Sequence, residues 1–236
     1  MTPRLLLFDI DGTMVRVRRG LSRTVFLDAF GTVLEIEEIS LPSGYTFHGR
    51  TDRSIYFDLA AHHEVNRMRA ESLVGDFIDA LIRGWNVSLD RNSVDLLPGV
   101  THLLDALESE GRHSLGLLTG NVRAGAIAKL APHDLYDRFI DGAFGSDATA
   151  RNDLPPIALE RIAAKSGTTF EPRDAVIIGD SVRDIECAQA HGLRVVAVAT
   201  GGSTRQELEG HDPDLLLDTL EEPAAFFQFL DSVTRP

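Results

Sequence analysis

A short apolar segment that runs into two carboxylates constrains the fold of this chain more than any other feature. Leu5, Leu6, Leu7 and Phe8 form an uninterrupted apolar run, and the sequence then reads Asp9-Ile10-Asp11-Gly12-Thr13. A strand over 4–10 of this kind is typical of a parallel sheet that is covered on both faces. Charge at the end of a buried strand is costly unless it has a partner. The pattern therefore predicts a strand that delivers two carboxylates to a chemical site.

Further apolar runs predict more strands of the same sheet. They are Ser114–Thr119, Ala175–Gly179, Arg194–Ala199, Asp214–Leu217 and a weaker run, Phe139–Phe144. Helical patterns alternate with them over Val100–Glu110, Pro156–Ser166 and Val182–Ala190, and the first two end directly before a glycine. Strand and helix in alternation predict an α/β fold, a Rossmann-like core with a parallel sheet.

One long stretch interrupts this alternation and predicts an inserted helical cap. Its helical patterns cover Ser22–Leu34, Asp52–His62 and Val65–Ile82, with Ser22 and Thr51 as candidate N-caps. Pro98-Gly99 marks the return to the α/β pattern. The expected organisation is a core made of residues 1–15 and 95–236 and a cap made of residues 16–94.

Composition narrows the possible partners and the location. The formal net charge of −13 argues against nucleic acid or an anionic membrane surface as a partner. No apolar run reaches the ~20 residues of a membrane span, and the acidic motif begins too early for a signal peptide. A single cysteine, Cys187, fits a reducing cytoplasm. We expect a cytoplasmic protein, a monomer or a homodimer, that acts on a small molecule.

Polar motifs follow three of the predicted strands. Asp9 and Asp11 end the first, Thr119-Gly120-Asn121 ends the second, and the segment from Gly179 to Asp184 ends the third. Ligands of open parallel sheets bind at the carboxyl ends of the strands. We therefore expect these three motifs to meet at one edge of the sheet.

The carboxylates suit a magnesium site and a phosphoryl-transfer reaction. Asp9, Asp11, Asp180 and Asp184 are the oxygen ligands that Mg²⁺ prefers, and Asp184 lies one helical turn after Asp180. Asp9 can attack phosphorus to form an aspartyl-phosphate. Asp11 can protonate the leaving oxygen and later deprotonate water.

The expected substrate contacts come from two other segments. Thr119 and the backbone amides of Gly120 and Asn121, at a predicted helix N-terminus, can bind phosphoryl oxygens. Arg50, in the predicted cap, can reach a second anionic group of the substrate. A surface salt bridge is the alternative role for Arg50.

These motifs resemble those of the haloacid dehalogenase superfamily, on its phosphatase side. The resemblance rests on Asp9–Thr13, on the strand that ends in Thr119–Asn121, and on Gly179–Asp184. It covers nearly the whole chain, because the predicted insertion resembles the C1 cap of the phosphoglycolate-phosphatase-like branch. It implies Mg²⁺-dependent hydrolysis of a small phosphomonoester. The dehalogenases of the superfamily lack the second acid, so Asp11 favours a phosphatase.

The chain departs from the family pattern at the third motif. The family has a lysine there, whereas the matching segment of this chain begins with Arg151 and continues to Pro156. The only two lysines, Lys129 and Lys165, lie in predicted helices away from this position. Arg151 is therefore expected to hold Asp9 and a phosphoryl oxygen.

Three other functions remain open at this stage. A β-phosphoglucomutase-like phosphotransferase or a 2-haloacid dehalogenase would use the same core, and a binding protein could retain the scaffold without the chemistry.

The substrate is expected to resemble phosphoglycolate, because Arg50 and the cluster of Arg16, Arg18 and Arg19 could bind a second negative charge.

Overall fold

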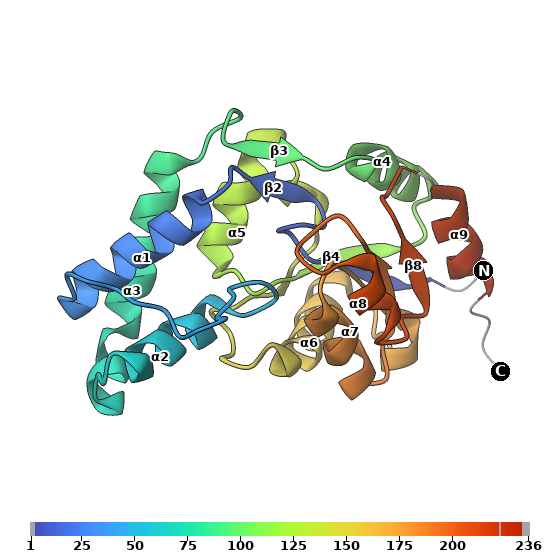
Figure 1. The fold of residues 1–236 in the computed structure, drawn as a ribbon. Coiled ribbons are helices and arrows are strands. Elements are labelled where there is room, and N and C mark those ends of the chain that lie inside the picture. Colours follow the sequence, from blue (N-terminus) through green and yellow to red (C-terminus); the bar gives the residue numbers. More distant parts are fainter. Residues whose placement is uncertain (1–2, 222, 233–236) are drawn as a thin grey trace.

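The computed structural model describes residues 3–221 and 223–232, and its central feature is a parallel β-sheet (Figure 1). Six strands form the sheet in the order β5-β4-β1-β6-β7-β8. Their bounds are Leu5–Phe8 (β1), Ser114–Leu118 (β4), Gly142–Ala143 (β5), Ala175–Gly179 (β6), Arg194–Val198 (β7) and Leu215–Leu217 (β8). The predicted α/β class with a Rossmann-like parallel sheet is confirmed.

Strand β1 lies at the centre of the sheet because it is apolar on both faces. It pairs in parallel with β4 on one side and β6 on the other. Side chains alternate between the faces of a strand, so Leu6 and Phe8 enter one hydrophobic cluster while Leu5 and Leu7 enter another. A continuous apolar run is what this two-sided burial requires.

Two layers of helices cover the faces of the sheet. The cluster around Leu6 and Phe8 is covered by α4 (Val100–Glu110), α5 (Arg123–Leu130) and α9 (Pro223–Ser232). The cluster around Leu5 and Leu7 is covered by α6 (Leu154–Ser166), α7 (Val182–Ala190) and α8 (Arg205–Glu209). Short 3₁₀ turns span Ala131–His133, Tyr136–Arg138, Arg151–Asp153 and Pro172–Asp174.

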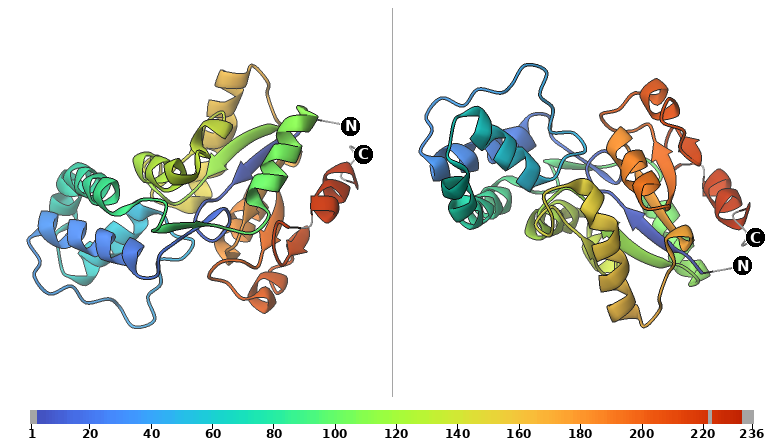
Figure 2. Two further views of the ribbon diagram at one scale, coloured as in Figure 1. Left: turned by 90° about the horizontal axis from the view of Figure 1, so that it is seen from above. Right: turned by 90° about the horizontal axis from the view of Figure 1, so that it is seen from below.

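Three helices, which we call the helical unit, form a separate layer with its own core. They are α1 (Leu21–Leu34), α2 (Asp52–His62) and α3 (Arg67–Ser88). Tyr56 of α2 stacks on Phe77 of α3 with ring centroids 4.6 Å apart, and Trp85 is buried in the same cluster. Figure 2 shows this unit beside the carboxyl-end edge of the sheet, away from the described ends of the chain.

A small two-stranded antiparallel sheet joins the helical unit to the main sheet, and the sequence patterns did not indicate it because they predicted mostly helices there. Strands β2 (Val15–Val17) and β3 (Val94–Leu96) pair antiparallel, with Val15 opposite Leu96. Each strand is only three residues long, too short for an alternating pattern to show. The two connections of the helical unit therefore leave the core side by side (Figure 1).

The helix boundaries test the predicted caps. Thr51 caps α2 by accepting a hydrogen bond from the Ser54 amide at 3.0 Å, as predicted. Ser22 does not cap α1, which begins at Leu21 after Gly20. Gly20 has φ +84°, a left-handed conformation that turns the chain into the helix without a side-chain cap.

Some predicted ranges shift by a few residues. Helix α3 begins at Arg67 and continues to Ser88, with Asn66 as its cap, rather than spanning 65–82. The weak strand 139–144 is reduced to the two residues of β5. In the part of the chain that the structure describes, no helix is long and apolar enough to cross a membrane.

Replacing Phe77 by alanine is expected to destabilise the helical unit. Phe77 is fully buried between Phe26 and Tyr56, so the cavity left behind costs about 3–5 kcal/mol. Urea unfolding followed by circular dichroism measures this loss. Met68→Ala is the matched control, because Met68 lies on the same helix but is 75% exposed. Equal losses in both variants would contradict the packing argument.

Candidate active site

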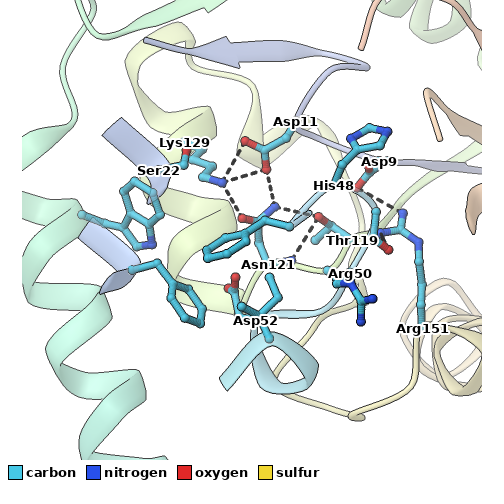
Figure 3. A pocket seen from close by; sticks show the side chains of 16 residues that line it. Asp9, Asp11, Ser22, His48, Arg50, Asp52, Thr119, Asn121, Lys129 and Arg151 are labelled. Carbon is cyan, nitrogen blue, oxygen red and sulfur yellow. Dashed lines mark hydrogen bonds and ion pairs between the residues drawn. The ribbon is translucent and has the colours of Figure 1, made fainter. Parts of the chain in front are cut away.

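The polar motifs meet where the strands end. Asp9 follows β1, Thr119 follows β4 and Asp180 follows β6, and neighbouring parallel strands bring all three to one edge. A cavity of about 240 Å³ opens there between the sheet and the helical unit (Figure 3). Its opposite wall is apolar and comes mainly from the helical unit: Phe26, Phe47, Ile55 and Trp85.

Three buried carboxylates form the most concentrated negative charge at this edge. Asp9, Asp180 and Asp184 each offer an oxygen, and these atoms lie within 4.8 Å of one another. Asp11 was expected in the same group, but its carboxylate contacts Lys129 and Asn121 instead. The group that could hold a metal therefore comprises three of the four predicted acids.

Burial and mutual repulsion disfavour the charged forms of Asp9 and Asp180. Burial raises the pKa of Asp9 to about 6, although the nearby guanidinium of Arg151 opposes that change. Burial and repulsion from Asp9 and Asp184 raise the pKa of Asp180 well above its usual value. Oδ1 of Asp9 is buried and accepts no hydrogen bond. Hard, mutually repelling oxygens with an unused acceptor suit a divalent cation such as Mg²⁺.

Backbone and hydroxyl groups fix two of these carboxylates in place. Thr13 donates from Oγ1 to Oδ1 of Asp180 at 3.2 Å, and the Gly202 amide donates to Oδ2 at 3.0 Å. Ser181 caps α7 in a capping box with Asp184, whose Oδ2 accepts from Ser181 Oγ at 2.6 Å. The chain can approach this closely because residue 201 is glycine: a Cβ there would lie 1.5 Å from Asp180 Oδ2.

Arg151 lies where the sequence places it, at the start of the segment before α6. It is buried, and its Nη2 donates to Oδ1 of Asp184 and lies 3.4 Å from Oδ1 of Asp9. The Nε of Arg151 is buried with no hydrogen-bond partner. The guanidinium thus bridges two acids of the cluster and lines the cavity (Figure 3).

Asp11 faces a second cation of the site, Lys129. Lys129 Nζ donates to Oδ1 and Oδ2 of Asp11 at 2.8 and 2.7 Å, and to Oδ1 of Asn121 at 2.6 Å. Lys129 lies eight residues after Asn121, in the last turn of α5, but long helical side chains extend toward the helix N-terminus. Lys129 thus lies away from the position of Arg151, as expected, but it contacts the other acid of the first motif, which the sequence patterns did not indicate.

The predicted phosphate-binding segment, Thr119–Asn121, contacts both the end of β1 and the loop that precedes α2. Thr119 accepts on Oγ1 from Nδ2 of Asn121 at 2.8 Å, and the same amide group donates to Asp11 at 2.7 Å. A Cβ on Gly120 would lie 2.0 Å from the carbonyl oxygen of Arg50, so only glycine lets the helical unit approach here. All three residues of the segment line the cavity.

Arg50 reaches the cavity from the loop that precedes α2. Its Nη1 donates to Oδ2 of Asp58 at 2.8 Å, and its guanidinium lies 4.7 Å from the ring centroid of Tyr45. Its Nε is buried without a hydrogen-bond partner. Of the arginines in the described chain, only Arg50 and Arg151 line this cavity. Arg16 instead donates to the carbonyl of Thr200 at 2.7 Å.

Two further residues of the site were not predicted. His48 Nε2 lies 3.5 Å from Oδ2 of Asp180, although His48 belongs to the segment before α2. Asp52 accepts from the Val122 amide at 2.8 Å, and burial raises the pKa of Asp52 to about 6. In the sequence, both residues lie within two positions of Arg50 and close to the predicted cap Thr51, and this was the only indication that they could reach the site. Nothing in the local sequence shows that this loop folds onto the sheet edge.

Comparison with known proteins agrees with this architecture. Residues 6–198 match the family model described as haloacid dehalogenase-like hydrolase. The phosphoglycolate phosphatase of Synechococcus elongatus is 28% identical to this chain, and the match covers 98% of this chain and 98% of that protein. A 5′-nucleotidase of Pseudomonas aeruginosa is 27% identical to this chain, and the match covers 88% of this chain and 88% of that protein.

A solved structure shows the same fold across the full length. The β-phosphoglucomutase of Clostridium difficile covers 100% of both chains with a TM-score of 0.72 and 15% identity. That likeness concerns the fold alone. Because the family model spans most of the chain, the protein belongs to the haloacid dehalogenase-like hydrolase family. The expected family and the expected enzyme class, a phosphoric monoester hydrolase, are thereby confirmed.

Mg²⁺ is expected to stabilise the protein against heat through the three-carboxylate group. A ligand that binds only the folded state at about 100 times its dissociation constant adds about 2.7 kcal/mol. Differential scanning calorimetry at neutral pH, with MgCl₂ and with EDTA, measures the shift in Tm. Asp180→Asn should abolish the shift. Asp153→Asn, an exposed acid at the start of α6, should retain it. A full shift in the Asp180 variant would rule out this group as the metal site.

Proposed function

We propose that this protein is a Mg²⁺-dependent phosphatase that hydrolyses a small phosphomonoester through an aspartyl-phosphate on Asp9. The observation that carries the proposal is the position of Asp9: a buried carboxylate on the cavity wall, close to Arg151 and to two further acids, whose Oδ1 accepts no hydrogen bond. The relatives named as phosphatases support the same reaction class.

The proposed reaction has two balanced steps. A carboxylate oxygen of Asp9 attacks phosphorus, and the bond from phosphorus to the ester oxygen breaks as Asp11 gives that oxygen a proton. Asp11 then takes a proton from water, whose oxygen attacks phosphorus and displaces the Asp9 carboxylate. The products are the alcohol and inorganic phosphate, and both aspartates return to their starting state.

Asp9, Asp180 and Asp184 would hold the magnesium ion. When bound, such a cation neutralises carboxylates and lets an anionic phosphate approach them. Arg151 supplies a fixed positive charge beside Asp9, and its unpartnered Nε can donate to a phosphoryl oxygen. Thr119, Gly120 and Asn121 line the same cavity and would position the phosphoryl group.

We further propose that residues 16–94 act as a cap. The helical unit supplies the apolar wall of the cavity, and the paired strands β2 and β3 carry its two covalent connections to the core. Closing such a unit over the site would exclude water from the phosphoryl group and place Arg50 near the substrate. The proposed setting is the cytoplasm, with the protein as a monomer or homodimer.

The proposed substrate carries a second anionic group, as phosphoglycolate does. Arg50 supports this choice because its buried Nε has no hydrogen-bond partner and its side chain lines the cavity. Relatives named phosphoglycolate phosphatases match over nearly the whole chain. Phosphate release and hexose phosphate interconversion, measured on the same samples, separate this activity from a mutase.

Asp9→Asn is expected to remove activity. The amide lacks the nucleophilic oxygen charge, so hydrolysis of p-nitrophenyl phosphate with Mg²⁺ should fall by at least about 10³-fold. Asp218→Asn, an exposed acid that pairs with Arg205, is the control and should keep full activity. Retention of wild-type turnover by the Asp9 variant would refute the covalent mechanism.

Arg50→Met is expected to raise KM for phosphoglycolate by about tenfold, because one charge-assisted hydrogen bond contributes about 1.5 kcal/mol. The KM for p-nitrophenyl phosphate should change much less, since that ester has no second anionic group. Asp58→Asn is the matched control, because it breaks the Arg50 ion pair but keeps the guanidinium. If neutral sugar phosphates are preferred over phosphoglycolate by the wild type, the substrate proposal fails.

A further inference from the structure

We infer that Lys129 is a positioning residue that holds Asp11 for the protonation of the leaving group. This inference rests on the phosphatase activity proposed above. Lys129 lies on α5, and it takes no part in the proposed roles of Asp9, Asp180 and Asp184. The acid pair at the end of β1 is thereby flanked by two cations, Arg151 beside Asp9 and Lys129 beside Asp11.

The geometry around Lys129 is complete. An ammonium group has three hydrogens, and Nζ of Lys129 has three acceptor oxygens, two from Asp11 and one from Asn121, at 2.6–2.8 Å. Nζ also lies 4.8 Å from the ring centroid of Trp85 in the helical unit. The lysine therefore connects the end of β1, the start of α5 and helix α3 at one point.

The burial of Lys129 fixes the position of the Asp11 carboxylate. The Lys129 side chain is only 4% exposed, while the Asp11 side chain is 40% exposed and faces the cavity. A buried ammonium keeps its partners because losing them would leave an unpaired charge. The half-exposed carboxylate of Asp11 therefore has one fixed anchor on its buried side, and Asn121 Nδ2 adds a second contact at 2.7 Å (Figure 3).

The other lysine shows that an ion pair of this kind need not belong to a site. Lys165 lies in the last turn of its helix, as Lys129 does, and its Nζ lies 2.7 Å from Oδ2 of the buried Asp141. Neither Lys165 nor Asp141 lines the cavity of Asp9. The two pairs share residue types and helix position, so they form a matched test and control.

The expected consequence concerns the basicity of the leaving group. A basic leaving oxygen must receive a proton as its bond to phosphorus breaks, so its departure depends on a well-placed acid. A weakly basic one, such as p-nitrophenolate, leaves with little help. Loss of the anchor on Asp11 should therefore slow esters of basic leaving groups selectively.

The experiment compares kcat/KM for phenyl phosphate and p-nitrophenyl phosphate in wild type, Lys129→Met and Lys165→Met. The two esters have nearly the same shape, but phenol has a pKa of about 10, like tyrosine, and p-nitrophenol is far more acidic. For Lys129→Met we expect a loss of about 100-fold on phenyl phosphate and under about tenfold on p-nitrophenyl phosphate. Lys165→Met should match wild type on both.

Equal losses on the two esters, or no loss, would overturn the positioning role. Lys129→Gln, which keeps a hydrogen-bond donor, serves in place of Lys129→Met if thermal unfolding shows that the methionine variant does not fold. Failure of wild type to hydrolyse either ester would refute the proposed function rather than the Lys129 contact.

A readout without turnover tests that contact separately. The chain has two lysines, so ¹⁵N-lysine labelling gives two side-chain ammonium signals. The Asp11→Asn variant should shift the Lys129 signal and leave the Lys165 signal in place. An unchanged Lys129 signal would overturn the inference whatever the activity.

Discussion

The structure depends on carboxylates that are buried at the end of a sheet and held by fixed cations. Asp9, Asp180 and Asp184 lie within a few ångströms of one another at the edge where β1 and β6 end. Burying one charge is costly, and burying three of the same sign is costlier still. Arg151 offsets part of this cost, although burial still raises the pKa of Asp9 to about 6. A divalent cation bound among these three carboxylates would offset the remaining cost.

The second acid of the first motif has a different environment from the first. Asp11 points away from the three-carboxylate group and pairs with Lys129, although only Ile10 separates it from Asp9. One carboxylate is therefore buried beside the acids, while the other is half-exposed on the cavity wall. Two carboxylates in different environments can perform different tasks, one as a nucleophile and one as a proton carrier.

The helical unit and the sheet share one site because glycines allow the loop before α2 to approach closely. Gly120 accommodates the Arg50 carbonyl, and Gly202 accommodates the His48 ring. The loop before α2 can therefore bring His48 and Arg50 to the edge of the sheet. The apolar wall of the helical unit then faces a charged floor, an arrangement that is typical of sites for small ligands, in which a few polar groups fix the orientation of the ligand.

The sequence by itself determined the sheet, most helix positions and the three strand-end motifs, because periodicity and strand-end polarity are local properties. It also placed Arg151 at the third motif. Only the tertiary structure decided that Lys129 joins Asp11, that Asp11 lies outside the acid group, and that His48 and Asp52 line the site. These contacts span up to 132 residues from His48 to Asp180, so no local pattern encodes them. They arise from the length of a lysine side chain, the close approach that glycine allows, and the way two separate cores pack at one edge.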